Sequence, residues 1–516
     1  MTGLSVLVAL LPVIVVLVLL IWRKTAADVA GLAGWLAAVL AAWLYFQTPL
    51  YVILKASLGG FIASFPITIM VGTSIYQITV MLETGAIARV VALIKTVAPK
   101  DKIIQIMIIN VGFGTLLAAM GATPVSILPP IMLGLGYSSY VAIALPSLGY
   151  DALCTYALLG IPVVVFANFV NLPVEQVGGY FARFMPVITS CIALGMLWIV
   201  GGLKMLFKGF LPAVLAGLTA GSIAIGMNKA HMVTLTGVAA GIGVILVMFL
   251  YLIVTRRPLR DRGALTEADL AAEKKMALGR ALSPWIILTF FAVLINTPIL
   301  PFFDFLFNKL TMPVRIIPGA PEKMRILWQA YFWILVSTLL ALPFLKPSRE
   351  QMAACRRKWL KRAPRPMLAS AVFFAIAYII NHSGKGLDWT LADPNHNMVY
   401  VLATAASRAF DKLYPLIAPF LGLLGGFISG SETSAIAMMT KLHLSTAEKI
   451  GAVGVVVAAA SGIGGGLASV ISPAKLQNAA ASIDRIGEEA TVLRTTFVIA
   501  LIITGVCALM SLLWVF

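Results

Sequence analysis

Residues 425–434, Gly-Gly-Phe-Ile-Ser-Gly-Ser-Glu-Thr-Ser, place polar side chains and flexible backbone between two apolar runs. The ten residues include three glycines, three serines, one threonine and one acid, Glu432. Glycine lets a membrane helix unwind, and nearby hydroxyls can satisfy the backbone groups that unwinding leaves unpaired. An ionised carboxyl at the centre of a spanning helix costs about 2.5–3.5 kcal/mol, so Glu432 must face a polar cavity or carry a proton. The stretch predicts a broken helix in a substrate or proton site; the alternative is a water-exposed loop between spans.

Similar interruptions occur elsewhere in the apolar chain. The first half has broken segments near 121–126 and 146–151, and the second half adds one near 461–475 to that at 425–434. The spacing from Gly121 to Gly149 is close to that from Gly430 to Ser461. Interrupted segments in corresponding places of two halves are typical of transporters with inverted repeats, whose substrate site lies at the repeat interface.

The side chains at these interruptions suit a small organic anion. Backbone N–H groups at the N-termini of half-helices bind anions without a charged side chain. Hydroxyl groups can hydrogen-bond a carboxylate or a 2-hydroxyl group. The substrate-binding candidates from these stretches are Thr123, Ser126, Ser431, Thr433, Ser434 and Ser472.

Four titratable residues complete the candidate set. Lys475 is a countercharge for the anion, or else a lone lysine that reaches the membrane interface. Desolvation favours the neutral form of a carboxyl, which suits Glu432 as the group that binds a coupled proton. Asp151 and His382 are further proton-transfer candidates. The competing roles are helix capping for Asp151 and a structural role for His382, as is usual for a histidine in a loop.

Composition identifies an integral membrane protein. Of the 516 residues 60% are hydrophobic and 11% are charged, and the mean hydropathy is +0.99. Runs such as Leu4–Trp22 and Thr495–Phe516 have about the 20 residues that span a bilayer. The net charge of +18 reflects basic cytoplasmic loops rather than a nucleic-acid partner. The four cysteines lack metal-ligand spacing and no nucleophile–base pair is evident, so we expect no enzyme, metal or cofactor.

The chain predicts an all-α membrane fold with roughly 12–14 spans and two inverted repeats. Residues 1–230 form the first membrane half, 231–366 the middle spans and 367–516 the second half. Two charged linkers, 256–283 and 346–366, interrupt the middle spans, and the second holds eight basic residues against one acid. The positive-inside bias predicts both linkers in the cytoplasm and both termini outside.

At the interrupted segments the chain resembles the bacterial L-lactate permease family. The matching motifs are Pro419-Phe420-Leu421-Gly422, Gly430-Ser431-Glu432-Thr433-Ser434, Ile471-Ser472-Pro473, Gly487-Glu488-Glu489, Leu133–Tyr137 and Gly160-Ile161-Pro162. Asn381 with Ser383-Gly384 also matches, which adds Asn381 to the substrate-binding candidates. The family usually has Asp where this chain has Glu432, and it tends to be neutral where this chain has Lys475.

The resemblance implies uptake of L-lactate, glycolate or a related 2-hydroxycarboxylate by proton symport across the bacterial cytoplasmic (inner) membrane. It also implies re-entrant hairpins and a scaffold along which a transport part moves like an elevator. The departures lie at the expected site, so another anion remains an option. The main alternative is a sodium-coupled carrier for dicarboxylates or other organic anions, and an anion channel is more distant. Assembly as a homodimer stays open.

Overall fold

The computed structural model describes residues 3–21, 23, 25–97, 101–121, 123–150, 153–263, 265–297, 300–483, 485 and 487–516. Almost all of its regular structure is helical, which confirms the all-α membrane class. Within the described residues, ten continuous helical segments are long and apolar enough to cross a membrane, or eleven if one bent pair counts as a span. Five apolar helices of 10–17 residues are shorter than that test requires.

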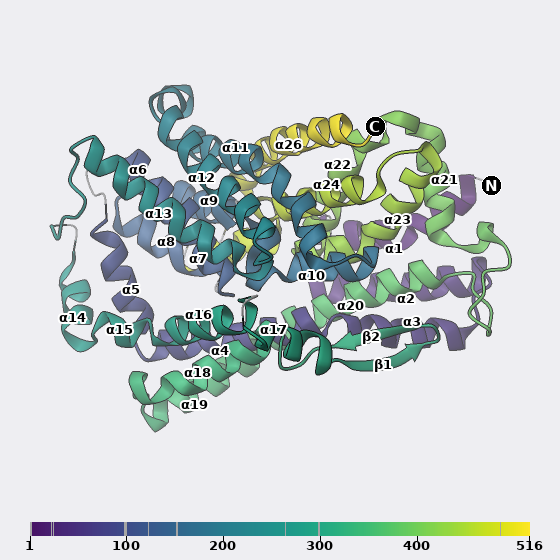
Figure 1. The fold of residues 1–516 in the computed structure, drawn as a ribbon, viewed down its shortest axis with the longest axis horizontal. Coiled ribbons are helices and arrows are strands. Elements are labelled where there is room, and N and C mark those ends of the chain that lie inside the picture. Colours follow the sequence, from purple (N-terminus) through teal and green to yellow (C-terminus); the bar gives the residue numbers. More distant parts are fainter. Residues whose placement is uncertain are drawn as a thin grey trace.

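A first group of helices packs together, mostly along the lower side of Figure 1. Its long axis is formed by α3 and α4, which follow one another and pack against α20, while α18 and α19 flank α4. The members are α1 (Gly3–Ile21), α2 (Ala27–Leu40), α3 (Leu50–Ala63), α4 (Phe65–Glu83), α16 (Ser283–Asn296), α18 (Ala330–Leu345), α19 (Arg349–Arg362) and α20 (Pro364–His382).

A second group lies above the first in Figure 1 and contains most of the interrupted segments. From the first half of the chain it takes α6 (Lys102–Ile106), α7 (Gly114–Ala119), α8 (Pro124–Gly134), α9 (Ser139–Tyr150), α10 (Ala157–Val170), α11 (Val174–Lys208), α12 (Phe210–Lys229) and α13 (Thr236–Val254). From the second half it takes α22 (Tyr414–Ser429), α23 (Glu432–Ile450), α24 (Gly454–Leu467), α25 (Pro473–Ala481) and α26 (Glu489–Trp514). The packing of α20 against α23 joins the two groups, and α21 (Met398–Phe410) bridges α1 and α23.

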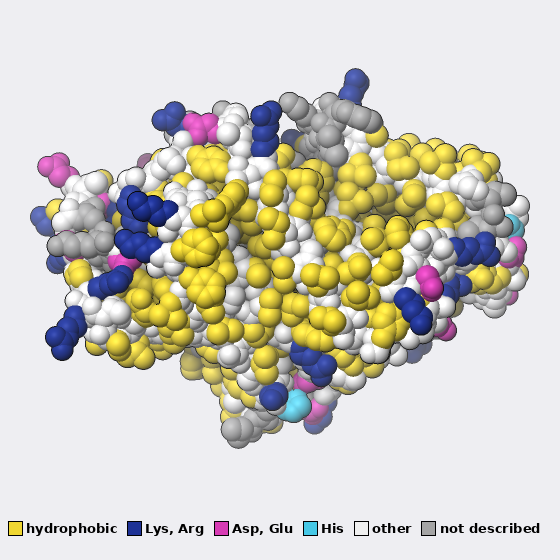
Figure 2. Space-filling view, turned by 90° about the horizontal axis from the view of Figure 1, so that it is seen from above, with side chains coloured by type: hydrophobic (Ala, Val, Ile, Leu, Met, Phe, Trp, Pro, Cys, Tyr) yellow, Lys and Arg dark blue, Asp and Glu magenta, His cyan; other side chains and the backbone are white. Residues whose placement is uncertain are grey.

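The exposed surface is that of a protein surrounded by lipid. Figure 2 shows a broad cover of hydrophobic side chains, with Lys and Arg mostly toward the edges of the face. Large side chains such as Leu246, Phe290 and Leu513 are more than half exposed. Contiguous apolar surface of this extent is stable only against hydrocarbon or another apolar surface.

The helices of the two charged linkers lie together with α5 at one end of the molecule. Figure 1 places α5 (Ala86–Lys95), α14 (Glu267–Lys275), α15 (Leu278–Ala281) and α19 toward the end opposite the N-terminus. A bidentate contact holds α14 on α5, because Lys95 Nζ donates to both carboxylate oxygens of Asp269 at 3.0 and 2.8 Å. Both partners of this ion pair are buried.

One element was not expected from the sequence. After α17 (Phe302–Asp304), the Pro-rich loop forms an antiparallel hairpin of β1 (Met312–Ile317) and β2 (Ala320–Met324). Gly319, with φ +73°, makes the turn. The hairpin packs against α3, and Tyr378 of α20 donates a hydrogen bond to Glu322 of β2. Two pairing strands were missed because the loop carries prolines and no clear alternation of apolar residues.

Candidate substrate and proton site

The first half of the chain has two helix interruptions. Between α7 and α8, Gly121 adopts φ +82°, a conformation that favours glycine. Between α9 and α10 the chain bends by 62°. Residues Leu158–Gly160 then have positive φ angles, which bulky residues adopt only under constraint from their surroundings. The break expected near 121–126 corresponds to irregular backbone at Gly121. The break expected near 146–151 does not, because residues 146–150 are still helical in α9 and the positive φ angles come later, at Leu158–Gly160; Asp151 lies outside the described residues.

The second half has two corresponding interruptions. Gly430, with φ +66°, separates α22 from α23, and a 3₁₀ turn over Ala468–Val470 separates α24 from α25. The glycine-rich run Ser461–Gly466 lies within α24 and not at the break. Its glycines let α22 and α24 approach closely, since a Cβ at Gly464 would overlap the carbonyl oxygen of Pro419.

Glu432 is the central side chain where these interruptions meet. It occupies the first turn of α23, where the helix dipole favours a negative charge, and is only 3% exposed. Its Oε1 accepts a hydrogen bond from Thr155 Oγ1 at 2.6 Å. Oε2 faces Gly466 of α24 and has no N–H or O–H donor among the described residues. A buried carboxyl with one hydroxyl partner is poorly compensated as an anion.

Thr155 was not among the site residues predicted from the sequence. It lies in the 3₁₀ turn Cys154–Tyr156 that follows the second interruption, 277 residues before Glu432, and is 2% exposed. Its position beside a helix interruption could have marked Thr155 as a candidate site residue. Nothing in the chain order indicated that this break would meet the one at Gly430.

The other candidates near Glu432 are mostly buried hydroxyls. Ser431 caps α23 by accepting a hydrogen bond from the backbone N–H of Ser434 at 3.4 Å. The Oγ of Ser434 is buried without a hydrogen-bond partner among the described residues. Thr433 is 3% exposed, and Ser472 is 1% exposed beside Gly430. These hydroxyls surround the N-termini of α23 and α25.

Lys475 lies in the first turn of α25, close enough to Glu432 to interact electrostatically. Its Nζ donates a 2.6 Å hydrogen bond to Ser469 Oγ. Glu432 is thus hydrogen-bonded to the Thr155 hydroxyl and Lys475 to the Ser469 hydroxyl.

A polar contact joins the first and last interruptions across the two halves of the chain. Asn478 Nδ2 of α25 donates to Ser126 Oγ of α8 at 2.9 Å. Thr123 is the N-cap residue of α8, and its side chain makes no capping bond. Contacts therefore link the start of α8 to the second half of α25, and Gly430 before α23 to Ser472 before α25.

Two candidates lie elsewhere and one cannot be placed. Asn381 and His382 end α20, where His382 Nδ1 lies 3.0 Å from Lys385 Nζ and is within electrostatic range of Lys441. Lys441 is nine residues beyond Glu432 on α23, a rise of about 13 Å. The structure does not bring Asn381 and His382 together with Glu432. Asp151 lies outside the described residues.

Comparisons with known sequences agree on one family. The sequence model of the L-lactate permease family matches residues 5–516. An L-lactate permease of Salmonella typhi is 26% identical, over 97% of this chain and 94% of the relative. A glycolate permease of Escherichia coli (strain K12) is 24% identical, over 99% and 96%. A solved structure of Neisseria gonorrhoeae MtrF, described as illuminating a class of antimetabolite efflux pumps, gives a TM-score of 0.45 at 13% identity, over 90% of this chain and 84% of that one.

The family match covers nearly the whole chain, and the relatives are permeases, which are transporters and not enzymes. The chain therefore belongs to the L-lactate permease family.

Proposed function

We propose that this protein takes up L-lactate or a related small 2-hydroxycarboxylate by proton symport across the bacterial inner membrane. Its relatives are L-lactate and glycolate permeases. The interrupted helices bring the N-termini of α23 and α25 together with several buried hydroxyls, and α8 contacts α25 through Ser126 and Asn478. Such a region supplies donors that can replace the hydration shell of a carboxylate.

The observation that carries the proton role is the burial of Glu432 against a single hydroxyl donor, Thr155. An anionic substrate held near an ionised Glu432 would be repelled, whereas a protonated Glu432 removes this repulsion. Binding of the proton and binding of the anion then favour each other, and this reciprocal coupling is what symport requires.

The residues have distinct roles in this proposal. The N-termini of α8, α23 and α25, with Thr123, Thr433, Ser434 and Ser472, bind the carboxylate and the 2-hydroxyl group. Lys475 provides a countercharge through a position fixed by Ser469. Asn381 and His382 end α20 beside Lys441, about 13 Å along α23 from Glu432, so we assign them no part in binding the same substrate.

Uptake into vesicles reconstituted with the purified protein tests the proposal. An imposed proton gradient should drive accumulation of labelled L-lactate, and a sodium gradient of equal size should not. Glycolate should compete with lactate, since one methyl group gives only about 1–3 kcal/mol of discrimination. Propionate should compete less well, because it leaves buried hydroxyls unpaired. Accumulation driven by sodium alone would favour the sodium-coupled carrier, and equal competition by propionate would contradict recognition of the 2-hydroxyl.

An elevator-like motion is part of the proposal, with the second helix group moving along the first. Spin-label distances between α4 and α25 should then change on adding substrate, while distances within the first group, such as α3 to α20, should stay constant. If the distances between α4 and α25 also stayed constant, the elevator-like motion would be contradicted. The proposal of proton coupling would be unaffected.

A further inference from the structure

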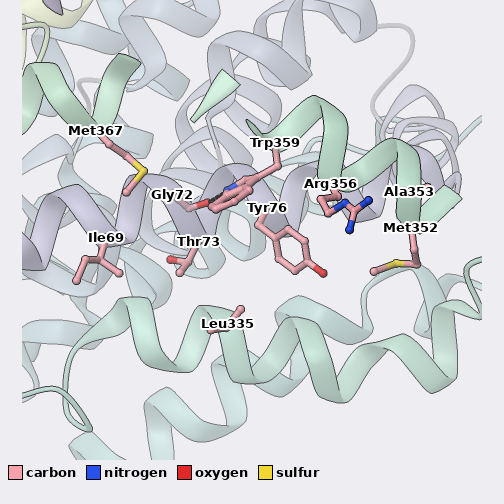
Figure 3. Close-up of a pocket in the computed structure, with 10 residues that line it drawn as sticks. All are labelled: Ile69, Gly72, Thr73, Tyr76, Leu335, Met352, Ala353, Arg356, Trp359 and Met367. Atoms are coloured by element: carbon pink, nitrogen blue, oxygen red, sulfur yellow. Dashed lines mark hydrogen bonds between the residues drawn. The ribbon is translucent and has the colours of Figure 1, made fainter. Parts of the chain in front are cut away.

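A large apolar cavity lies in the first helix group, apart from Glu432. It has a volume of about 680 Å³ and is bounded by α4, α18, α19 and the start of α20 (Figure 3). Its lining includes Ile69, Tyr76, Leu335, Met352 and Met367, with Arg356 as its one charged residue. This volume falls within the range of small-ligand sites, and the apolar lining suits a hydrocarbon chain.

Helix α19 forms one wall and is held on α4 at several points. Trp359 Nε1 donates to the carbonyl oxygen of Gly72 at 2.8 Å, and Gln351 Nε2 donates to that of Glu83 at 2.7 Å. Between them the Cys355 thiol donates to the carbonyl oxygen of Thr79. These bonds fix α19 in place, so the cavity beside it is a built feature of the fold.

The charge of α19 places this wall at the boundary between membrane and water. The helix holds six basic residues and one acid, Glu350, which is too much charge for the hydrocarbon region. Lys358 pairs with Glu83 of α4. Arg356 lines the cavity mouth, is exposed, and pairs with no acidic side chain among the described residues. The cavity thus combines an apolar interior with one unpaired cation at its polar edge.

We propose that this cavity binds an anionic phospholipid of the cytoplasmic leaflet, with an acyl chain among the apolar side chains and the phosphate at Arg356. Charge complementarity selects this occupant: a guanidinium binds phosphate by bidentate hydrogen bonds, and basic helices beside a membrane attract anionic headgroups. An acyl chain alone would not need the arginine, and a free phosphate would not need the apolar cavity. Since α19 connects α18 to α20, bound lipid would brace the first helix group.

Native mass spectrometry of the full chain in detergent tests the proposal, with phosphatidylglycerol and phosphatidylcholine of identical acyl chains as probes. Arg356→Gln should weaken binding of phosphatidylglycerol about fivefold and leave phosphatidylcholine binding unchanged. The matched control is Arg357→Gln, which removes the same charge from the neighbouring residue that does not line the cavity. It should bind both lipids as the native protein does.

A second variant fills the cavity without changing charge. Ala353 is an exposed cavity-lining residue, so Ala353→Trp should occupy the space and reduce tight binding of both lipids at least tenfold. If this variant does not elute as a single folded species, Leu335→Trp from the opposite wall replaces it. Equal losses with Arg356→Gln and Arg357→Gln would show diffuse attraction and overturn the proposal. The proposal would also be overturned if a cavity-filling variant still bound the lipids. It would equally be overturned if that variant dissociated a dimer, because the cavity would then be covered by a second copy of the chain.

Discussion

At the scale of single residues, the hydrogen-bond partner of Glu432 limits what this carboxyl can do. Among the described residues its hydroxyl donor is Thr155, which comes from a different interruption, and the neighbouring Cys154 thiol is a weaker donor. The cation Lys475 is hydrogen-bonded to Ser469. A carboxyl locked in a buried ion pair would stay ionised throughout the transport cycle. A carboxyl held by a hydroxyl can gain and lose a proton without leaving an unpaired lysine behind.

The change Glu432→Gln mimics the protonated form and keeps an acceptor for Thr155. We expect the variant to bind substrate and to exchange it across vesicles, because both require only the protonated carrier. Net uptake driven by a proton gradient should be lost, since no proton is released inside. Exchange and gradient-driven uptake are measured on the same vesicles, and full gradient-driven uptake would refute the proton role.

Variants of Lys475 test whether Glu432 serves to bind a coupled proton or to form an ion pair with Lys475. If Glu432 and Lys475 formed a buried ion pair, each single neutral variant would lose about 3–5 kcal/mol of stability and the double variant would recover it. We expect no such recovery, because each side chain has its own hydroxyl partner. Thermal unfolding in detergent of Glu432→Gln, Lys475→Met and the double variant checks this, and a double variant more stable than both singles would contradict it.

At the scale of secondary-structure elements, glycines determine how closely the helices of the site approach. The second-half site depends on α22 lying directly against α24, and the glycines of both helices face the partner backbone. This contact places Gly466 against Glu432. Small residues at such a crossing allow the close backbone approach on which helix packing in membranes depends.

Adding a methyl group at Gly422 should push these helices apart. A Cβ there would overlap the carbonyl oxygen of Ser461, which is backbone and cannot move aside. We expect Gly422→Ala to destabilise the protein by about 1–3 kcal/mol or more and to reduce uptake. Gly505→Ala in α26 is the matched control, because nothing lies within 4 Å of its Cβ position. Thermal unfolding in detergent measures both, and similar melting temperatures would disprove the packing role.

The docking of α14 on α5 is an element-scale feature that depends on pH. Burial raises the pKa of the Asp269 carboxyl, but hydrogen bonds from Lys95 and Thr266 outweigh burial and hold its pKa below the ordinary value. The unfolded value is about 3.9, so the ionised carboxyl stabilises docking fully above about pH 5 and loses this effect as the pH falls below about 4.

The mobility of a nitroxide label at the exposed Leu270 of α14 measures this docking. We expect a restricted label from pH 7 to pH 5 and a mobile label near pH 3. Asp269→Asn should reduce the pH dependence, because its side chain carries no charge at any pH, while the pair of Glu273 on α14 with Arg89 on α5 is left in place. Release of the label with a midpoint above pH 5 would contradict the lowered pKa.

At the scale of the whole molecule, the two halves show the same order of elements around the site. In the first half the order is two interrupted segments, α7–α8 and α9–α10, followed by the long helix α11. In the second half it is α22–α23 and α24–α25, followed by α26. We propose that these are the two inverted repeats, with the substrate region where they meet.

Membrane orientation is the prediction that belongs to this scale. Both basic linkers, 256–283 and 346–366, should face the cytoplasm and both termini should lie outside. Single cysteines at positions 260 and 357, in a variant without the four native cysteines, should resist a membrane-impermeant thiol reagent in intact cells. They should react once the membrane is opened, and a cysteine near the N-terminus should react in both cases. Labelling of either linker from outside would reverse the orientation.

The membrane class and the family could be predicted from the sequence alone, and Glu432 was already a candidate there. These follow from local properties, namely apolar runs long enough to span a bilayer, basic loops between them, and glycine with hydroxyl residues around Glu432. Which helix interruptions meet can be seen only in the tertiary structure, because the contacts between them join residues hundreds of positions apart. Thr155 became the partner of Glu432, Ser126 met Asn478, and the run Ser461–Gly466 proved to be a packing surface. A side chain's partner depends on how whole helices cross, and no local pattern in the chain encodes that crossing.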